Sequence, residues 1–255
     1  MTRLPAIHDR DLATGRAADP AAHARAVQAM FARISRHYDR LNHLLSWNCD
    51  RRWRRRAAAR LDPGTVRVLD LCAGTGDLGL ACLAAGRARD VVAVDFTPQM
   101  LARLAGKPGA TAVRAVAGDA LCLPFRDAWA DALVVGFGVR NLADPTASAR
   151  EMRRVLRPGG QLLVLEFFRA DAHATGPGRG PAAPVRKLLA GLVPCVGRLA
   201  AGDRAAYTYL PESMDRFLSA ETYRGLLAQE GFADVFVERL TLGVAHLVGG
   251  RRPLA

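Results

Sequence analysis

The chain has 255 residues, half of them hydrophobic, which is enough to bury the core of one sizeable α/β domain with additions. It has no stretch of about 18 consecutive apolar residues, so no transmembrane helix is expected. The five cysteines are scattered and form no CxxC pair. Their spacing argues against a disulfide framework or a zinc site, and it favours a reducing, cytoplasmic environment.

Positive charge dominates the sequence. The formal net charge is +12, and Lys107 and Lys187 are the only lysines among 36 basic residues. Such an arginine excess attracts anionic surfaces, for example phospholipid headgroups or nucleic acid. It is equally typical of a solvated, arginine-rich surface that reflects genome base composition, and the sequence leaves both interpretations open.

The ends and the middle of the chain differ in composition. Residues 1–22 have no apolar segment typical of a secretory signal, and they are expected to form a disordered leader before one domain over residues 23–255. Within that domain, residues 23–60 show helical spacing and predict an N-terminal helical cover. Residues 169–219 lose regular alternation and predict a cover segment inserted on the substrate side.

The densest charge cluster is Arg51–Arg56, interrupted only by Trp53. A tryptophan among arginines suits a membrane interface or stacking on nucleic acid. The alternative is a solvated helix face with Trp53 packed inward, and we favour this alternative.

The stretch Val66–Asp77, VRVLDLCAGTGD, predicts a buried strand, a glycine turn and the start of a helix. The turn is the Gly-Thr-Gly of residues 74–76, and Asp77 is expected to cap the helix beginning at Leu78. Strand, glycine turn and helix form the first unit of a nucleotide-type binding site, where a side chain would hold the ligand away from the backbone.

Acidic residues end the next two predicted strands. Asp95 lies in the second strand, Val91–Phe96, and Asp119 follows the third, Ala112–Val116. The first carboxylate is placed to accept hydrogen bonds from ribose hydroxyls, and the second to meet an adenine amino group. Each aspartate could instead only cap a local turn or the helix that starts at Pro98.

The fourth predicted strand, Ala132–Gly136, runs into the sequence GFGVRN, at the end of the sheet where ligands bind in open α/β folds. A helix, a turn, a strand, a further helix and two closing strands complete the pattern: Thr146–Leu156, Arg157–Gly160, Gln161–Phe167, Ala220–Glu230, Val235–Val237 and Val244–Val248.

Together these elements predict a doubly wound, seven-stranded sheet of the class I S-adenosylmethionine-dependent methyltransferase type, which is Rossmann-like, with N-terminal helices. Several motifs are more specific, among them YDRLNHLLS at 38–46, LDLCAGTGDL at 69–78, GFGVRN at 136–141 and AYTYLPESM at 206–214. With these motifs, the chain from about Met30 to Gly250 resembles the quinone-biosynthesis C-methyltransferases, which methylate demethylmenaquinol or 2-polyprenyl-6-methoxy-benzoquinol.

The resemblance implies S-adenosylmethionine as cofactor and assigns residues to its parts. Thr75 with Gly74 and Gly76 would hold the methionine moiety, and Asp95 the ribose. The remaining residues implied for the cofactor are Asp119 and Ala120 at the adenine and Gly136 at the end of the fourth strand. The chain departs from the family at Gly136, where serine is frequent, and at Cys72, which we expect to be a small core residue.

The implied reaction is methyl transfer to a ring carbon, which becomes nucleophilic when the quinone is reduced and a phenolic proton is lost. Arg140 would stabilise the phenolate or polarise a water, and Asn141 would orient the same oxygen. Tyr38 and Asp39 are further catalytic candidates from the helical cover, and no metal is required. Arg140 could instead be structural and pair with Asp144.

The expected substrate is a polyprenylated quinol, demethylmenaquinol in the first instance, in menaquinone or ubiquinone biosynthesis. The alternative is C-methylation of another small phenolic compound. The protein is expected in the cytoplasm, with peripheral contact at the inner face of the membrane, and a homodimer stays open. Nucleic acid is not expected as a substrate, because GFGVRN stands where an amino-methylating enzyme would carry an Asn/Asp-Pro-Pro-aromatic motif.

Overall fold

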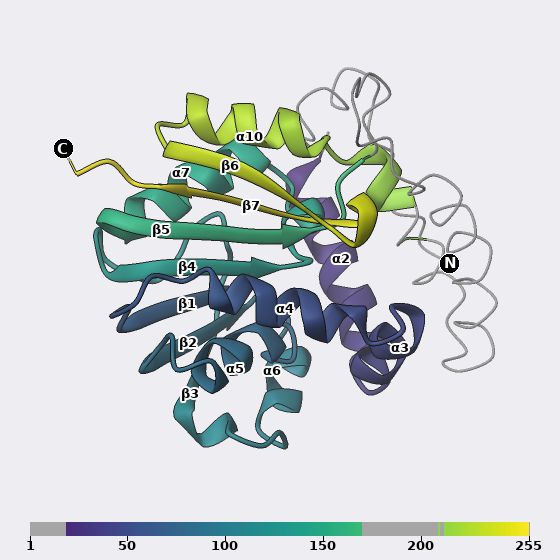
Figure 1. Ribbon diagram of the computed structural model, residues 1–255. Coiled ribbons are helices and arrows are strands. Elements are labelled where there is room, and N and C mark those ends of the chain that lie inside the picture. Colours follow the sequence, from purple (N-terminus) through teal and green to yellow (C-terminus); the bar gives the residue numbers. More distant parts are fainter. Residues whose placement is uncertain (1–18, 170–208, 210–211, 255) are drawn as a thin grey trace.

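The computed structural model describes residues 19–169, 209 and 212–254. At its centre is a seven-stranded sheet with the order β3-β2-β1-β4-β5-β7-β6 (Figure 1). The first five strands pair in parallel, and β7 runs antiparallel to both β5 and β6. The strands are β1 (Arg67–Leu71), β2 (Asp90–Asp95), β3 (Val113–Ala117), β4 (Ala130–Gly136), β5 (Leu156–Glu166), β6 (Ala233–Leu240) and β7 (Ala245–Arg251). The predicted seven-stranded, doubly wound sheet is confirmed.

Helices cover both faces of this sheet (Figure 1). One face packs on α4, α5 and α6, the other on α7 and α10, while α2 and α3 lie beyond the carboxyl ends of the parallel strands. The helices are α2 (Pro20–Ile34), α3 (Tyr38–Leu45), α4 (Cys49–Ala59), α5 (Asp77–Ala84), α6 (Pro98–Leu104), α7 (Pro145–Val155) and α10 (Ala220–Gln229), with short 3₁₀ turns η1 (Ala110–Ala112), η2 (Val139–Asn141) and η3 (Thr241–Gly243). Among the helices described, none is both long and apolar enough to cross a bilayer.

The core follows from strands that are apolar on both faces. In β1 and β4, Val68 and Val134 face the α4 and α5 side, whereas the next residues, Leu69 and Val135, face α7 and α10. Successive side chains of a strand point to opposite faces, so a parallel sheet covered on both sides has strands that are mostly apolar on both faces.

Helix starts are fixed by local hydrogen bonds. Asp144 Oδ1 accepts from the backbone N–H groups of Thr146 and Ala147, both at 3.0 Å, and Pro145 occupies the first turn of α7. Ser219 Oγ accepts from Thr222 N at 3.1 Å in the same way at α10. These side chains satisfy N–H groups that have no partner within the helix.

Some predicted boundaries differ from the structure. The first helix begins at Pro20, capped by Asp19, and not at residue 23. The expected cap at Asp77 is wrong: Gly76 is the N-cap of α5, and the Asp77 carboxylate accepts from Lys107 instead.

The predicted turn at residues 157–160 is present as an irregularity within β5. Pairing with β4 jumps from Leu156 to Gln161, and Gly159 has a positive φ of 76°. Gly159 N donates to Arg252 O at 2.8 Å, so the end of the chain holds this turn in place. The closing strands β6 and β7 are longer than predicted, because their outer residues also join the ladder.

Trp53 packs inward, as we favoured. Its side chain is 5% exposed, its ring lies 5.7 Å from that of Phe167, and Nε1 donates to Thr241 Oγ1 at 2.8 Å. A membrane or nucleic-acid contact by Trp53 is therefore wrong, because the indole is already enclosed by α4, β5 and η3.

We expect Trp53→Ala to lower the free energy of unfolding by about 3–5 kcal/mol, since it leaves a large cavity in the core. The matched control is Trp47→Ala, because Trp47 is 84% exposed and its loss should change stability by no more than about 0.5 kcal/mol. Urea denaturation followed by circular dichroism measures both. Equal losses in the two variants would contradict the assignment of Trp53 to the core.

Candidate functional site

A pocket lies at the carboxyl ends of β1, β2, β3 and β4, between these strand ends and helices α2 and α3. The order of the strands reverses between β1 and β4, and ligands of doubly wound sheets bind at such a point. The predicted site residues that line the pocket are Tyr38, Gly74, Asp95, Asp119, Ala120, Gly136 and Asn141. The others, Asp39, Thr75, Gly76 and Arg140, do not belong to its lining.

The two glycines of the turn after β1 serve different purposes. Gly74 and Gly76 both have a positive φ, 57° and 79°. A Cβ on Gly74 would point to Met100 Cε at 3.3 Å and Tyr38 Cε1 at 4.0 Å, inside the pocket. A Cβ on Gly76 would lie 2.6 Å from Leu104 Cδ1, so Gly76 permits the turn to pack on α6. Only the first glycine keeps space open for a ligand.

Asp95 joins the turns after β1 and β2. Its Oδ2 accepts from Gly74 N at 2.7 Å, and its Oδ1 accepts from Thr97 N at 2.8 Å. Burial raises the pKa of the Asp95 carboxyl above its ordinary value, and the hydrogen bonds from Thr97 and Gly74 oppose that shift. The local alternative drawn from the sequence is present, since Asp95 holds the start of α6; Asp95 also lines the pocket, and the ribose assignment stays a prediction.

Asp119 combines a turn with an open acceptor. Its Oδ1 accepts from Leu121 N at 2.9 Å, which is the local turn expected for an aspartate after a glycine. Oδ2 has no partner within the described part of the chain, and the residue lines the pocket next to Ala120. A carboxylate oxygen is therefore available to a hydrogen-bond donor on a ligand.

Small residues bring the ends of β1 and β4 close together. A Cβ on Gly138 would lie 2.3 Å from Cys72 Cβ, and one on Gly136 would lie 3.2 Å from Leu78 Cδ2. Cys72 has a φ of 51°, lines the pocket and packs at the edge of the core, so it is a core residue only in part. Burial raises the pKa of its thiol, so the residue is a neutral thiol and not a thiolate nucleophile.

Tyr38 at the start of α3 and Asn141 in η2 also line the pocket. Asn141 Oδ1 accepts from Tyr209 OH at 3.0 Å, and the Asn141 backbone carbonyl is 3.1 Å from His23 Nε2. The Tyr38 ring meets Phe31 edge-on, with centroids 5.8 Å apart. Burial raises the pKa of Tyr38, so its hydroxyl stays protonated and can donate a hydrogen bond.

Arg140 is buried in an ion pair with Glu166, so the alternative in which it pairs with Asp144 is wrong. Nη1 donates to Glu166 Oε1 at 2.6 Å and to Phe137 O at 2.8 Å, and Nε donates to Ser213 Oγ at 3.3 Å. The Arg140 side chain is 5% exposed and that of Glu166 is 0% exposed. Asp144 is instead the N-cap of α7.

The buried charges of Arg140 and Glu166 affect the pKa values of each other and of a neighbouring tyrosine. Burial alone would lower the pKa of Arg140, but the negative charge of Glu166 raises it, so the guanidinium stays protonated. Burial raises the pKa of Glu166, and Arg140 opposes that shift. Burial also raises the pKa of Tyr209 to about 12, and the Arg140 charge counteracts it. Nη2 of Arg140 has no hydrogen-bond partner among the residues that the structure describes.

Asp39 and Thr75 face each other outside the pocket. The Thr75 hydroxyl donates to Asp39 Oδ1 at 2.6 Å, and Lys107 Nζ lies 2.7 Å from Thr75 Oγ1 and 2.7 Å from Asp39 Oδ2. Lys107 Nζ also reaches Asp77 Oδ1 at 2.5 Å. This network joins Asp39 of α3 to Thr75 of the glycine turn through Lys107, so it holds the turn in place from outside the pocket.

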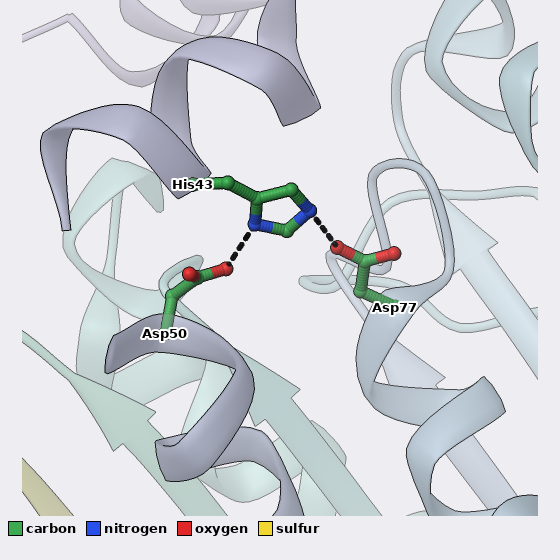
Figure 2. A group of neighbouring side chains, drawn as sticks. All are labelled: His43, Asp50 and Asp77. Atoms are coloured by element: carbon green, nitrogen blue, oxygen red, sulfur yellow. Dashed lines mark hydrogen bonds and ion pairs between the residues drawn. The ribbon is translucent and has the colours of Figure 1, made fainter. Parts of the chain in front are cut away.

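His43 extends the network between two acidic residues (Figure 2). Its Nδ1 is 2.7 Å from Asp50 Oδ2, and its Nε2 is 4.0 Å from Asp77 Oδ2. Such a grouping can hold a metal, but Arg54 already binds Asp50 and Lys107 already binds Asp77. Burial alone would raise the pKa of Asp50, but hydrogen bonds from Ser46 and the charge of Arg54 hold it below its ordinary value. We therefore interpret the cluster as a charge network and assign it no metal.

Solved structures that share this fold include methyltransferases and an enzyme with a different activity. An S-adenosylmethionine-dependent methyltransferase of Thermotoga maritima matches with a TM-score of 0.58 and 17% identity, over 88% of this chain and 99% of its own. The [4+2]-cyclase SpnF matches with a TM-score of 0.58 and 19% identity, over 80% of this chain and 81% of its own. The fold is thus that of the class I S-adenosylmethionine-dependent methyltransferases, and fold alone does not fix the reaction.

The family follows from sequence. Residues 20–251 match the ubiE/COQ5 methyltransferase family, and the chain belongs to it. It is 42% identical over 227 residues to a demethylmenaquinone methyltransferase of Thermus thermophilus, covering 88% of this chain and 100% of that protein. It is 36% identical to a ubiquinone/menaquinone biosynthesis C-methyltransferase UbiE of a Caulobacter species, covering 91% and 94%. The protein is an S-adenosylmethionine-dependent C-methyltransferase, and the resemblance found in its motifs is confirmed.

Two residues of the site were not found by reasoning from the sequence. Glu166 lies within the predicted fifth strand, where an acid in an apolar run was a signal of a buried partner. Lys107 follows α6 and had no motif of its own, although it is one of two lysines in the chain.

Proposed function

We propose that the protein transfers a methyl group from S-adenosylmethionine to a ring carbon of a polyprenylated quinol, with demethylmenaquinol as substrate and menaquinol as product. The observation that carries this proposal is the buried Arg140–Glu166 pair, whose arginine directly precedes Asn141 of the pocket lining. The names of the relatives support the same substrate class, since they include both demethylmenaquinone and ubiquinone/menaquinone methyltransferases.

The pocket residues fit the proposed cofactor. Gly74 leaves open the space that a Cβ would fill, Asp95 supplies a carboxylate for the ribose, and Asp119 Oδ2 is available to the adenine amino group. Ala120 would contact the adenine ring, and Gly136 would offer only backbone. When bound, the cofactor supplies an electrophilic methyl group on its sulfonium.

The residues of the chain then act on the quinol. Arg140 holds a permanent positive charge that stabilises the phenolate form of the ring, which makes the neighbouring carbon a better nucleophile. Asn141 Nδ2 and the Tyr38 hydroxyl orient the phenolic oxygen, and the orientation of the ring toward the cofactor lowers the entropic part of the barrier. Thr75 and Asp39 keep the glycine turn in place through Lys107 and would not touch the substrate.

The substrate is tested directly. Purified protein is incubated with methyl-labelled S-adenosylmethionine and either reduced demethylmenaquinone or reduced 2-polyprenyl-6-methoxy-benzoquinone. We expect label in menaquinol, and the unreduced quinones serve as controls that should stay unlabelled. Label only in the benzoquinol product would change the assigned substrate, label in a tail-free phenol alone would favour the small-phenol alternative, and label in none would refute the quinol proposal.

Asp95→Ala should weaken the affinity for S-adenosylmethionine by about 10- to 100-fold, the range expected for lost hydrogen bonds to a charged group. Turnover at saturating cofactor should change little. In the wild type the affinity should fall as the pH drops through the raised pKa of Asp95, because the protonated carboxyl accepts ribose hydroxyls poorly. Calorimetric titration measures the affinity of the variant and the pH dependence of the wild-type affinity. An unchanged affinity in the variant would overturn the ribose assignment.

Arg140→Ala should lower kcat by about 10²- to 10³-fold, as for removal of a donor that stabilises a developing oxyanion. The affinity for S-adenosylmethionine should stay nearly unchanged. Because this variant leaves Glu166 buried without its cation, the double variant Arg140→Ala with Glu166→Gln controls for folding. If cofactor affinity collapses in the double variant while the fold is intact, Arg140 belongs to the cofactor site.

The prenyl tail places the substrate in lipid, so we also propose that the protein works in the cytoplasm at the inner face of the membrane, as a peripheral protein. Trp53 cannot make this contact, because it is buried. The homodimer stays a prediction, which sedimentation equilibrium would test.

A further inference from the structure

The corner between α3 and α4 exposes two large apolar side chains. Leu44 is 60% exposed and Trp47 is 84% exposed. Trp47 and Asn48 both have a positive φ, 52° and 58°, an unfavourable conformation for residues other than glycine. Backbone hydrogen bonds from Trp47 N to Leu44 O at 3.1 Å and from Asn48 N to His43 O at 2.8 Å hold this turn. The turn thus keeps an indole in solvent, where it contributes nothing to the core.

Exposed arginines surround these two residues, and we name this set the corner surface: Arg40, Leu44, Trp47, Arg51, Arg52 and Arg55. None of its four arginines has an acidic partner within the described residues. The next two arginines of α4 differ, since Arg56 and Arg60 both pair with Glu238. One side of α4 is therefore neutralised by β6, and the other side presents uncompensated positive charge.

The acidic residues of the groove beside the corner surface do not neutralise its arginines. Asp39 and Asp77 line the groove, but both are bound to Lys107, and Asp50 is bound to Arg54. The acidic groups that face the corner surface are thus already paired, so its arginines keep their attraction for an external anion.

The corner surface lies at the same end of the molecule as the pocket. Helix α3 lies beyond the carboxyl ends of the parallel strands (Figure 1), and its first residue, Tyr38, lines the pocket. Its last turn carries Leu44, and Trp47 follows directly. One short helix therefore links the substrate side of the pocket to the exposed apolar residues.

We propose that the corner surface docks the protein on a bilayer that contains anionic phospholipids. The guanidinium groups of Arg51, Arg52 and Arg55 bind headgroup phosphates, the Trp47 indole lies at headgroup level, and Leu44 enters the boundary of the acyl chains. This inference rests on the proposed function, because a prenylated quinol must be taken from lipid. It assigns the contact to residues other than the buried Trp53.

The test measures binding to phosphatidylglycerol–phosphatidylcholine vesicles by sedimentation, with vesicles of phosphatidylcholine alone as the comparison. The wild type should bind the anionic vesicles and lose binding at high salt. Arg51→Ala/Arg55→Ala should reduce partitioning by about 25-fold, at roughly five-fold per arginine. The matched control is Arg89→Ala/Arg126→Ala, which removes two exposed arginines near the starts of β2 and β4, at the other end of the sheet.

Trp47 supplies a second readout. Its fluorescence should shift to the blue on anionic vesicles, and Trp47→Phe should abolish the shift, since Trp53 is already buried and Trp129, the third tryptophan, directly precedes β4 at the other end of the sheet. Equal losses in the two arginine pairs, or no shift in the wild type, would overturn the proposal. A third outcome would also overturn it. If Arg51→Ala/Arg55→Ala loses binding to a single-stranded RNA oligonucleotide but keeps its binding to vesicles, the surface binds nucleic acid.

Turnover separates this inference from the proposed function. With a short-tailed, water-soluble quinol, the corner variant should match the wild type, and with long-tailed quinol in anionic vesicles it should fall with the loss of binding. If no quinol is methylated by the wild type, the proposed function fails while vesicle binding still decides the docking surface. Equal turnover of wild type and corner variant on vesicles, despite weaker binding, would show that the surface is not used to reach the substrate.

Discussion

The hydrogen bond from Gly74 N to Asp95 Oδ2, 2.7 Å long, is the contact on which the site depends. It joins the turns after the neighbouring strands β1 and β2, which both line the pocket beside the point where the strand order reverses. A left-handed backbone at Gly74 lets the N–H reach the carboxylate, and the missing Cβ leaves the space in front of it open. The same carboxylate fixes the start of α6 through Thr97. Asp95 thus organises two turns at the same time as it lines the pocket.

Much of the fold was predictable because its signals are local. The strands are recognisable in the sequence as apolar runs. The glycine turn, Asp95 and Asp119 each lie at or shortly after the end of a strand, so the parallel sheet brings them to one edge. The same reasoning placed Asn141 at the pocket, whereas Tyr38 was a candidate from the helical cover. Helix ends were harder, since Asp77 looks like a cap in sequence but is drawn away by Lys107.

The contacts that could not be predicted join side chains far apart in the chain. The sequence offered a pair between Arg140 and Asp144 as an alternative, yet Asp144 is used by the first turn of α7, and Glu166 comes from the adjacent strand β5. Likewise, the run Arg51–Arg56 gives no hint of which arginines meet Glu238 and which stay unpaired. Those outcomes depend on how α4 is rotated against the sheet, and this rotation is set by Trp53 and the rings around it.

The ammonium group of Lys107 has a chemical consequence of its own. It meets three oxygen atoms, from Asp39, Thr75 and Asp77, within 2.7 Å. A tetrahedral –NH₃⁺ can direct its three hydrogens to three acceptors around one small space, whereas a planar guanidinium directs its donors in a flat fork. In a chain where 34 of 36 basic residues are arginine, this position holds one of the two lysines, and the arrangement of its three acceptors suits an ammonium better than a planar guanidinium. At this position the shape of the cation therefore matters as well as its charge, so an Arg-for-Lys exchange would keep the charge and still disturb the contacts of the glycine turn.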